Sequence, residues 1–210
     1  MATSHLAQSE RSSLCDMLIQ SGPSAPTLCA GWLTRDLAAH LLVRERRPLA
    51  MPGILLGGPF QKLTDKAMTV AVRTFGFVGV VAKVRFGPPL LWKPFDELVN
   101  LVEFFVHCED VRRAQSDWEP RSDPQLDAAL WSMLGRMSKL MTHKLKGVGL
   151  ELESPFGERI VARRGESVAV LSGGAQELVL YLYGRSQAAK VSLGGAETAQ
   201  QAVREASFGI

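Results

Sequence analysis

Cysteine is scarce in this sequence, and the few copies present are far apart. Cys15, Cys29 and Cys108 are odd in number and include no CxxC pair. This spacing argues against a disulfide framework and against a zinc knuckle built from cysteines. We interpret the three residues as buried, reduced thiols.

Charge of one sign and long hydrophobic runs are also lacking. The 24 Lys and Arg and 21 Asp and Glu give a net charge of +3. These charges are spread along the chain, so nucleic acid is not an expected partner. Segment 1–14 has polar residues where a secretion signal has an apolar core, which predicts a cytoplasmic protein. The most apolar stretch, 75–92, is interrupted by Lys83, Arg85 and a Gly-Pro-Pro turn at 87–89, so no membrane span is expected.

Apolar residues do recur at helical spacing, and the period changes near Gly147. Before that residue the pattern predicts helices over 3–20, 34–47, 60–74, 76–86, 95–115 and 124–145. After it, short alternating runs at Leu150, Ile160 and Val168 predict strands, and 176–183 and 197–206 have helical composition. The sequence therefore predicts a mainly α protein, with a helical bundle over 1–146 and a small α+β domain over 147–210 packed against it.

Local signals predict two of the boundaries. Asp123 followed by Pro124 is typical of the start of a helix, because the aspartate can cap free N–H groups and the proline suits the first turn. The Ser-Pro-Phe-Gly segment at 154–157 predicts a hairpin turn between two strands.

A polar stripe runs along the otherwise apolar helix predicted over 95–115. Asn100, Glu103, His107 and Asp110 step by three and four residues, so they share one helix face. A carboxylate among valine and phenylalanine side chains is costly to bury unless an opposite charge compensates it. A cation would do so, since a Glu and a His four residues apart can bind one ion together.

His40 is the third candidate ligand, because it lies among apolar residues on another predicted helix. Neighbouring helices can bring it opposite Glu103 and His107. Two imidazoles and one carboxylate are the ligand set of several catalytic zinc sites, which leave a fourth position for water or substrate. The sequence thus predicts one divalent metal ion, with zinc expected, held by these three residues.

Each ligand imidazole also needs a partner for its second nitrogen. Asp36, four residues before His40, and Asp110, three residues after His107, are the candidates. Structural alternatives exist for each residue. A Glu–His pair at this spacing is often a surface pair, a lone histidine often belongs to the core, and an acid in a first turn suits the helix dipole. Cys108 lies about 100° around the helix from His107 and is interpreted as a packing thiol.

Three segments resemble the mycothiol-dependent maleylpyruvate isomerase family. Residues 27–32 read Thr-Leu-Cys-Ala-Gly-Trp and lead into Asp-Leu-Ala-Ala-His-Leu at 36–41. Residues 103–114 read Glu-Phe-Phe-Val-His-Cys-Glu-Asp-Val-Arg-Arg-Ala. Residues 177–185 resemble the motif that ends a helix in the family's small C-terminal domain.

The resemblance implies a DinB-like, four-helix-type bundle that binds metal, followed by a small α+β domain. It also implies that His40, Glu103 and His107 are zinc ligands and that Arg185 faces the cleft. Many members have a second histidine where this chain has Cys108, a departure that leaves the three ligands in place.

The function implied by the resemblance is a thiol-dependent enzyme that uses mycothiol. A metal-bound thiolate that adds to a small electrophilic substrate gives isomerisation if it leaves again and S-transfer if it stays. The alternatives are a metal-stabilised binding or stress-response module without turnover, and a hydrolase, for which no unassigned carboxylate is placed as a base. Arg185, Arg112 and Arg113 are candidates for a substrate carboxylate, although arginines at a helix end are usually solvated. The sequence does not identify the substrate. It also leaves the oligomeric state undetermined between a monomer and a homodimer.

Overall fold

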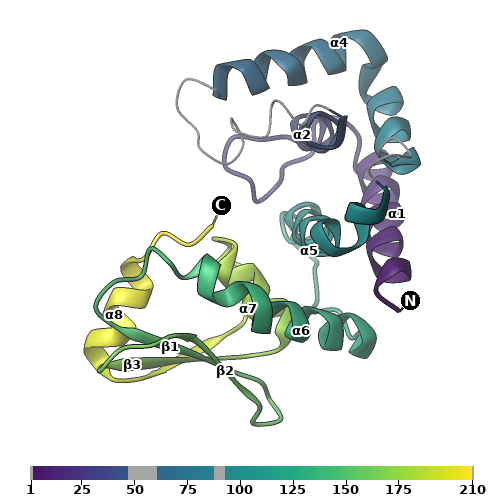
Figure 1. Ribbon diagram of the computed structural model, residues 1–210. Helices are drawn as coiled ribbons and strands as arrows, with labels where there is room; N and C mark the ends of the chain where they lie inside the picture. The colour runs from purple at the N-terminus through teal and green to yellow at the C-terminus, as the bar shows by residue number, and fades with distance from the viewer. Residues whose placement is uncertain (1, 47–60, 88–92, 210) are drawn as a thin grey trace. The chain divides into compact units, whose positions relative to one another are not determined.

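The computed structural model describes residues 2–46, 61–87 and 93–209, and the chain divides into two compact units (Figure 1). The first unit is Met1–Glu119 and the second is Pro120–Ile210. The described part of the chain is mainly helical and contains one small sheet, which confirms the predicted fold class.

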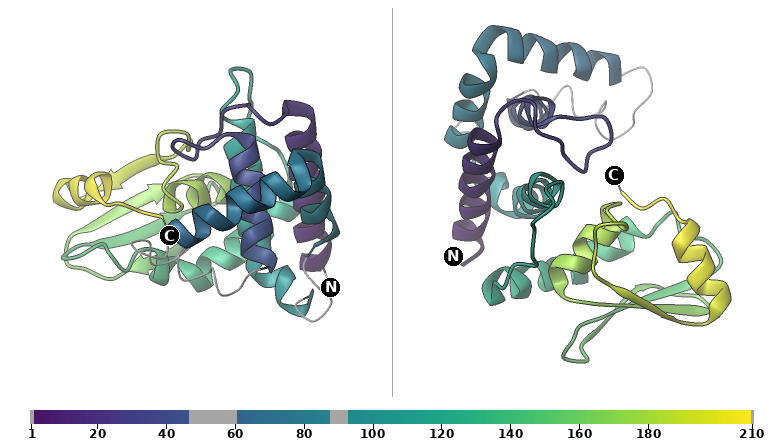
Figure 2. Two further views of the ribbon diagram at one scale, coloured as in Figure 1. Left: turned by 90° about the horizontal axis from the view of Figure 1, so that it is seen from above. Right: turned by 180° about the vertical axis from the view of Figure 1, so that it is seen from behind.

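Four helices lie in the described part of the first unit, and a shared apolar core holds them together. Helix α1 packs against α5, and α2 packs against α4, which crosses it (Figures 1 and 2). Fully buried side chains from all four helices meet in one cluster, and each buried aliphatic or aromatic side chain contributes roughly 1.5–3 kcal/mol. The helices are α1 Ala2–Ser21, α2 Thr34–Arg46, α4 Gln61–Phe86 and α5 Lys93–Arg112.

Helix α4 contains a break at Gly76, which has a φ of 64° and a ψ of 169°. Only glycine adopts that conformation without a steric penalty. The break falls between the two predicted helices 60–74 and 76–86. The predicted turn at 87–89 lies mostly outside the described residues.

Within the described residues, α4 is also the one helix that is long and apolar enough to cross a membrane by length and composition. The segment Thr64–Phe86 has a mean hydropathy of 1.5. The interrupted stretch at 75–92 overlaps only the second half of this segment. The burial of Val80 and Val84 in the core of the first unit accounts for part of the segment's apolar character.

The second unit is built around a four-stranded sheet with the order β2-β1-β3-β4. Strand β1 pairs antiparallel with β2 and parallel with β3, and β3 pairs antiparallel with β4. The predicted hairpin turn is confirmed, because Gly157 N–H donates to the Ser154 carbonyl at 3.0 Å. The elements are α6 Pro124–Met141, β1 Gly149–Glu153, β2 Arg159–Arg163, β3 Val168–Ser172, α7 Ala175–Leu182, β4 Ser192–Gly195 and α8 Glu197–Glu205.

Helix α6 packs within the second unit, so the division between the units falls before it and not at the expected 146/147. The Asp123 side chain accepts hydrogen bonds from two N–H groups of the first turn, which confirms the predicted cap. Helix α6 packs on α7 and β2, and Thr142 Oγ1 donates to the Ala162 carbonyl at 3.0 Å. The period change near Gly147 marks where the sheet begins, but a helical period does not reveal which neighbour a helix packs against.

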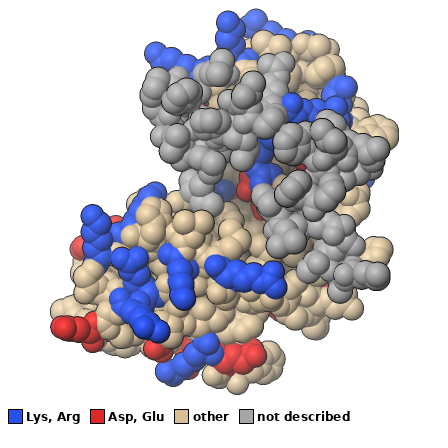
Figure 3. All heavy atoms as spheres, viewed as in Figure 1, with Lys and Arg blue, Asp and Glu red and all other residues tan. Residues whose placement is uncertain are grey.

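Lys and Arg side chains occur at several separate places on the face of the second unit in Figure 3, with Asp and Glu side chains along its edge. This agrees with the mixed charges of the sequence.

Candidate metal centre

The polar stripe of α5 and His40 of α2 meet in the first unit. Glu103 Oε1 lies 3.5 Å from His40 Nε2 and 3.3 Å from His107 Nε2. One ligand-type atom from each of the three residues lies within 4.8 Å of the other two. Both histidines are buried, and the Glu103 side chain is 19% exposed. The fold thus brings together the three residues that the sequence predicted as ligands.

These separations fit a divalent ion. Zinc binds imidazole nitrogen and carboxylate oxygen at about 2.0–2.2 Å, which puts neighbouring ligand atoms of a tetrahedral site about 3.3–3.6 Å apart. The two distances to Glu103 Oε1 fall in that interval. The ligand atoms are of the types that zinc binds, and their spacing suits a tetrahedral site. His40, Glu103 and His107 would therefore hold a divalent ion as three protein ligands.

Asp110 sits on the other side of the His107 ring. Its Oδ2 lies 2.8 Å from His107 Nδ1, and its side chain is completely buried. If Nδ1 carries the proton and donates it to Asp110, the lone pair of Nε2 is directed at Glu103. Asp110 therefore occupies the orienting position that the sequence suggested for it.

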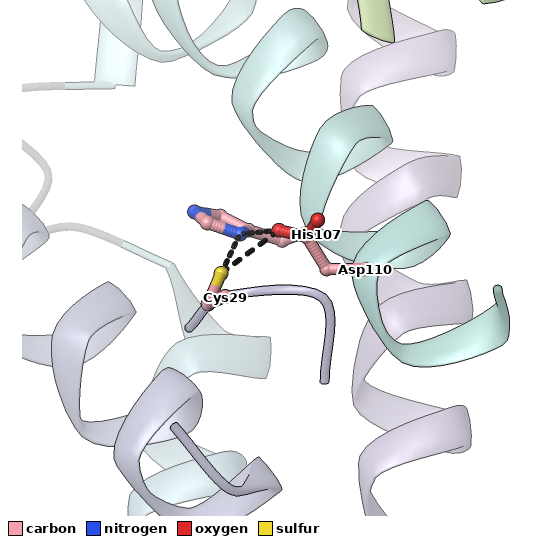
Figure 4. A group of neighbouring side chains, drawn as sticks. All are labelled: Cys29, His107 and Asp110. Carbon is pink, nitrogen blue, oxygen red and sulfur yellow. Dashed lines mark hydrogen bonds and ion pairs between the residues drawn. The ribbon is translucent and has the colours of Figure 1, made fainter. Parts of the chain in front are cut away.

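Cys29 lies beside His107 and Asp110, as Figure 4 shows, a placement that sequence analysis did not predict. Its Sγ donates to Asp110 Oδ2 at 3.1 Å and lies 4.0 Å from His107 Nδ1. The loop that carries it is tied to α5, because Leu28 N–H donates to the Asp110 carbonyl at 3.0 Å. Cys29 is half-buried and not fully buried as expected. It belongs to a second group of metal-ligand type with His107 and Asp110.

Asp36 takes the role of a helix cap. Its Oδ2 accepts a hydrogen bond from Leu33 N–H at 3.0 Å, just before α2 begins. The structure records no hydrogen bond from Asp36 to His40, both of which are described. The ring of Trp32 packs near His40 instead, with the ring centroids 5.0 Å apart. The first-turn alternative considered for Asp36 is the one that matches this geometry.

Arg44 is a further member of the site that sequence analysis missed. Its Nε lies 3.4 Å from Glu103 Oε1, and its Nη1 donates to Asn100 Oδ1 at 2.5 Å. The Arg44 side chain is only 10% exposed. The sequence spacing could have indicated it, because Arg44 follows His40 by four residues and therefore lies on the same face of α2.

The other arginines considered have different surroundings. Arg112 and Arg113 both donate to Glu109, and the Arg113 guanidinium lies 4.3 Å from the centroid of the Trp118 ring. They belong to a buried ion-pair cluster and not to a solvated helix end. Arg185 lies in the second unit, where its Nη1 donates to the Tyr183 carbonyl at 2.6 Å.

Two solved structures share the fold of this chain, and both are mycothiol-dependent maleylpyruvate isomerases. One is 18% identical, with a TM-score of 0.62. The other, a variant with one histidine replaced by alanine, is 17% identical, with a TM-score of 0.63. In both cases the match covers 91% of this chain and 91% of the other. The chain has the fold of mycothiol-dependent maleylpyruvate isomerase. No protein-family model matches it, and comparison with curated proteins finds no similar sequence.

The predicted resemblance is therefore confirmed at the level of the fold. At these identities, structural similarity to the isomerase shows the fold of this chain and not its activity.

The charges of the site differ between its two histidines. Burial raises the pKa of Glu103, but hydrogen bonds from His107 and His40 and the charge of Arg44 outweigh it and hold this pKa well below its usual value. Burial lowers the pKa of His40. Burial also acts to lower the pKa of His107, but contacts with Asp110, Cys29 and Glu103 outweigh it and raise this pKa well above its usual value. Without an ion, these pKa shifts favour an ionised Glu103, a neutral His40 and a protonated His107 near neutral pH.

Metal binding is expected to depend on pH through His107. An ion on Nε2 must displace a proton wherever His107 is charged, which is the case below its raised pKa. Apparent metal affinity should therefore rise about tenfold per pH unit below that pKa and level off above it. Competition with a chromophoric chelator over a range of pH values measures this dependence.

The Asp110→Asn variant is the matched control, because it removes the carboxylate that raises the pKa of His107. Its affinity should level off at a lower pH than that of the unchanged protein. The same pH dependence in both proteins would contradict the assignment of the displaced proton to His107.

Proposed function

We propose that this protein is a metal- and thiol-dependent enzyme that acts on a small electrophilic substrate. His40, Glu103 and His107 would hold a divalent ion, with zinc expected, and mycothiol is the expected thiol. The observation that carries the proposal is the convergence of three side chains of metal-ligand type, which would leave a fourth position of a bound ion open. The shared fold with the two isomerase structures supports it.

A bound zinc ion would supply a positive charge that keeps a thiol sulfur at the open position in its thiolate form. Isomerisation and S-transfer both start from a thiolate beside an electron-poor double bond, so the ligand set serves either reaction.

The residues around the site prepare it for that role. Asp110 accepts from His107 on the Nδ1 side, which leaves Nε2 facing the position of the ion. Hydrogen bonds from His107 and His40, together with the smaller effect of the Arg44 charge, hold the pKa of Glu103 well below its usual value. Trp32 packs against the His40 ring and limits the positions that this ring can adopt.

The placement of Cys29 supports an open fourth position. Its sulfur lies beside Nδ1 of His107, whereas the ion would be bound through Nε2 on the opposite side of the ring. Cys108, the other cysteine near the stripe, donates to the Glu10 carbonyl at 3.3 Å and is fully buried in the core. Among the described residues, neither of these thiols is directed to the fourth position, so an external thiol can take it.

The remaining parts of the proposal rest on the sequence. We propose a cytoplasmic protein without a nucleic-acid or membrane partner. Arg185 stays a candidate for the substrate carboxylate on the resemblance of 177–185 to the family motif.

Thiol binding is expected to release a proton, and this tests the proposal. A free thiol has a pKa of about 8.5, so near pH 7 it must lose close to one proton to bind as a thiolate. Calorimetry of mycothiol binding to the zinc-loaded protein, in two buffers of different ionisation enthalpy, measures that proton. With cobalt in place of zinc, the visible spectrum should change as sulfur becomes a ligand.

The His107→Ala protein is the control, because it lacks a metal ligand but keeps every cysteine. Mycothiol that binds to the unchanged protein without proton release or spectral change would contradict metal–thiolate chemistry. Metal uptake with no binding of mycothiol would favour the alternative of a metal-stabilised module without turnover.

A further inference from the structure

The guanidinium of Arg44 is placed where it would oppose a metal ion. It contacts Glu103 Oε1, the same oxygen that faces both histidines. In the absence of an ion, Arg44 compensates the charge of the carboxylate. With an ion bound at Glu103, the nearly buried cation of Arg44 and the ion would repel each other, because little water separates them.

The sum of the charges shows what would relieve that repulsion. Two neutral imidazoles and the Glu103 carboxylate leave a divalent ion with a surplus positive charge. The negative charge of Asp110, on the Nδ1 side of His107, cancels this surplus. The positive charge of Arg44 then leaves the centre with a net positive charge again. The centre as a whole is therefore positive when it holds an ion, and a negatively charged ligand at the open position makes it neutral.

Arg44 also has donors left for such a ligand. A guanidinium carries five N–H donors, and Arg44 uses its Nε and Nη1 groups toward Glu103 and Asn100. Its Nη2 group has no acceptor among the described residues. Guanidinium N–H groups form strong, charge-assisted hydrogen bonds with anions.

We infer that Arg44 determines the ligand preference of the open metal position and favours anionic over neutral ligands there. This inference rests on the proposed metal centre and deepens it, because it gives the class of ligand that the centre accepts. The small thiol would bind as its anion, and neutral donors such as imidazole would be disfavoured. Arg44 is thus a specificity-determining residue that acts through charge and through its free donors.

The test compares two small probes on the cobalt-loaded full-length chain, with azide as the anion and imidazole as the neutral ligand. Both give changes in the visible spectrum of cobalt that can be titrated. In the Arg44→Gln protein, azide affinity should fall by about tenfold or more, because the cation 3.4 Å from Glu103 Oε1 is lost. Imidazole affinity should stay within about twofold of its value in the unchanged protein, because neutral imidazole has no charge that Arg44 could attract.

Two further variants separate charge from structure. Arg44→Lys keeps the charge and should retain most of the preference for azide. Arg35→Gln removes an arginine from the same helix whose side chain is 46% exposed, and it should leave both affinities unchanged. If the glutamine protein does not fold, Arg44→Met keeps an unbranched side chain and gives the same comparison.

The outcomes are distinct. An unchanged ratio of azide to imidazole affinity in the Arg44→Gln or Arg44→Met protein, with cobalt bound, would overturn the inference and leave the proposed centre standing. Failure of the unchanged protein to bind cobalt would overturn the proposed centre and this inference with it. A selective loss of azide binding supports the inference, whether or not mycothiol proves to be the thiol.

Discussion

Replacing His107 by alanine is expected to remove the metal ion from the protein. The change deletes one ligand nitrogen and leaves the buried Asp110 carboxylate without its imidazole partner. Losing a residue that only orients a ligand costs about 10–100-fold in metal affinity, so the loss of a ligand should cost more than about 100-fold. Elemental analysis after dialysis against a weak chelator measures the metal content of each chain.

The same loss is expected for His40→Ala, whose nitrogen faces the same carboxylate oxygen. His143→Ala is the matched control, because His143 is an exposed residue of the second unit that bonds to the Leu140 carbonyl. Its metal content should equal that of the unchanged protein. If folded His40→Ala and His107→Ala proteins both kept their metal, the proposed ligand set would have to be abandoned.

Glu109→Ala is expected to destabilise the first unit strongly. Glu109 is completely buried and accepts hydrogen bonds from both Arg112 and Arg113. Without it, the buried guanidinium of Arg113 loses this carboxylate partner, although Trp118 still covers one face of it. Removal of one partner from a buried ion pair typically costs about 3–5 kcal/mol. Urea unfolding followed by circular dichroism gives the change in the free energy of unfolding.

An exposed pair in the second unit provides the comparison. Glu153 receives two hydrogen bonds from Arg159 on the surface of the sheet, where water screens both charges. Glu153→Ala should therefore change stability little. A Glu109→Ala protein as stable as this control would show that Arg113 finds other compensation in the core.

The nearness of the candidate ligands on α5 could be predicted from the sequence because helical periodicity is local. The spacing of Glu103, His107 and Asp110 places them on one face of a helix whatever the rest of the fold does. The break in α4 was also visible, since it falls at a glycine between two apolar segments. The position of His40 could not be predicted from local spacing alone, because its approach to Glu103 depends on the packing of α2 in the bundle.

Contacts between distant residues could not be predicted in the same way. The Cys29–Asp110 hydrogen bond joins residues 81 positions apart, and no spacing rule connects a loop to the middle of a helix. Arg44 was on the right face of α2, but its partner Asn100 became evident only from the fold. Strand β4 has the sequence Ser-Leu-Gly-Gly, which lacks the alternation that reveals a strand. Helix α6 was assigned to the bundle from the sequence because a helix has the same hydrophobic period whichever unit it packs in.

The division at Glu119 has a consequence for how such a protein can change over generations. His40, Glu103, His107 and their partners Cys29, Arg44 and Asp110 are all encoded before that point. Mutations after residue 119 therefore alter the sheet, its arginines and helix α6, while every codon of the proposed metal site stays intact.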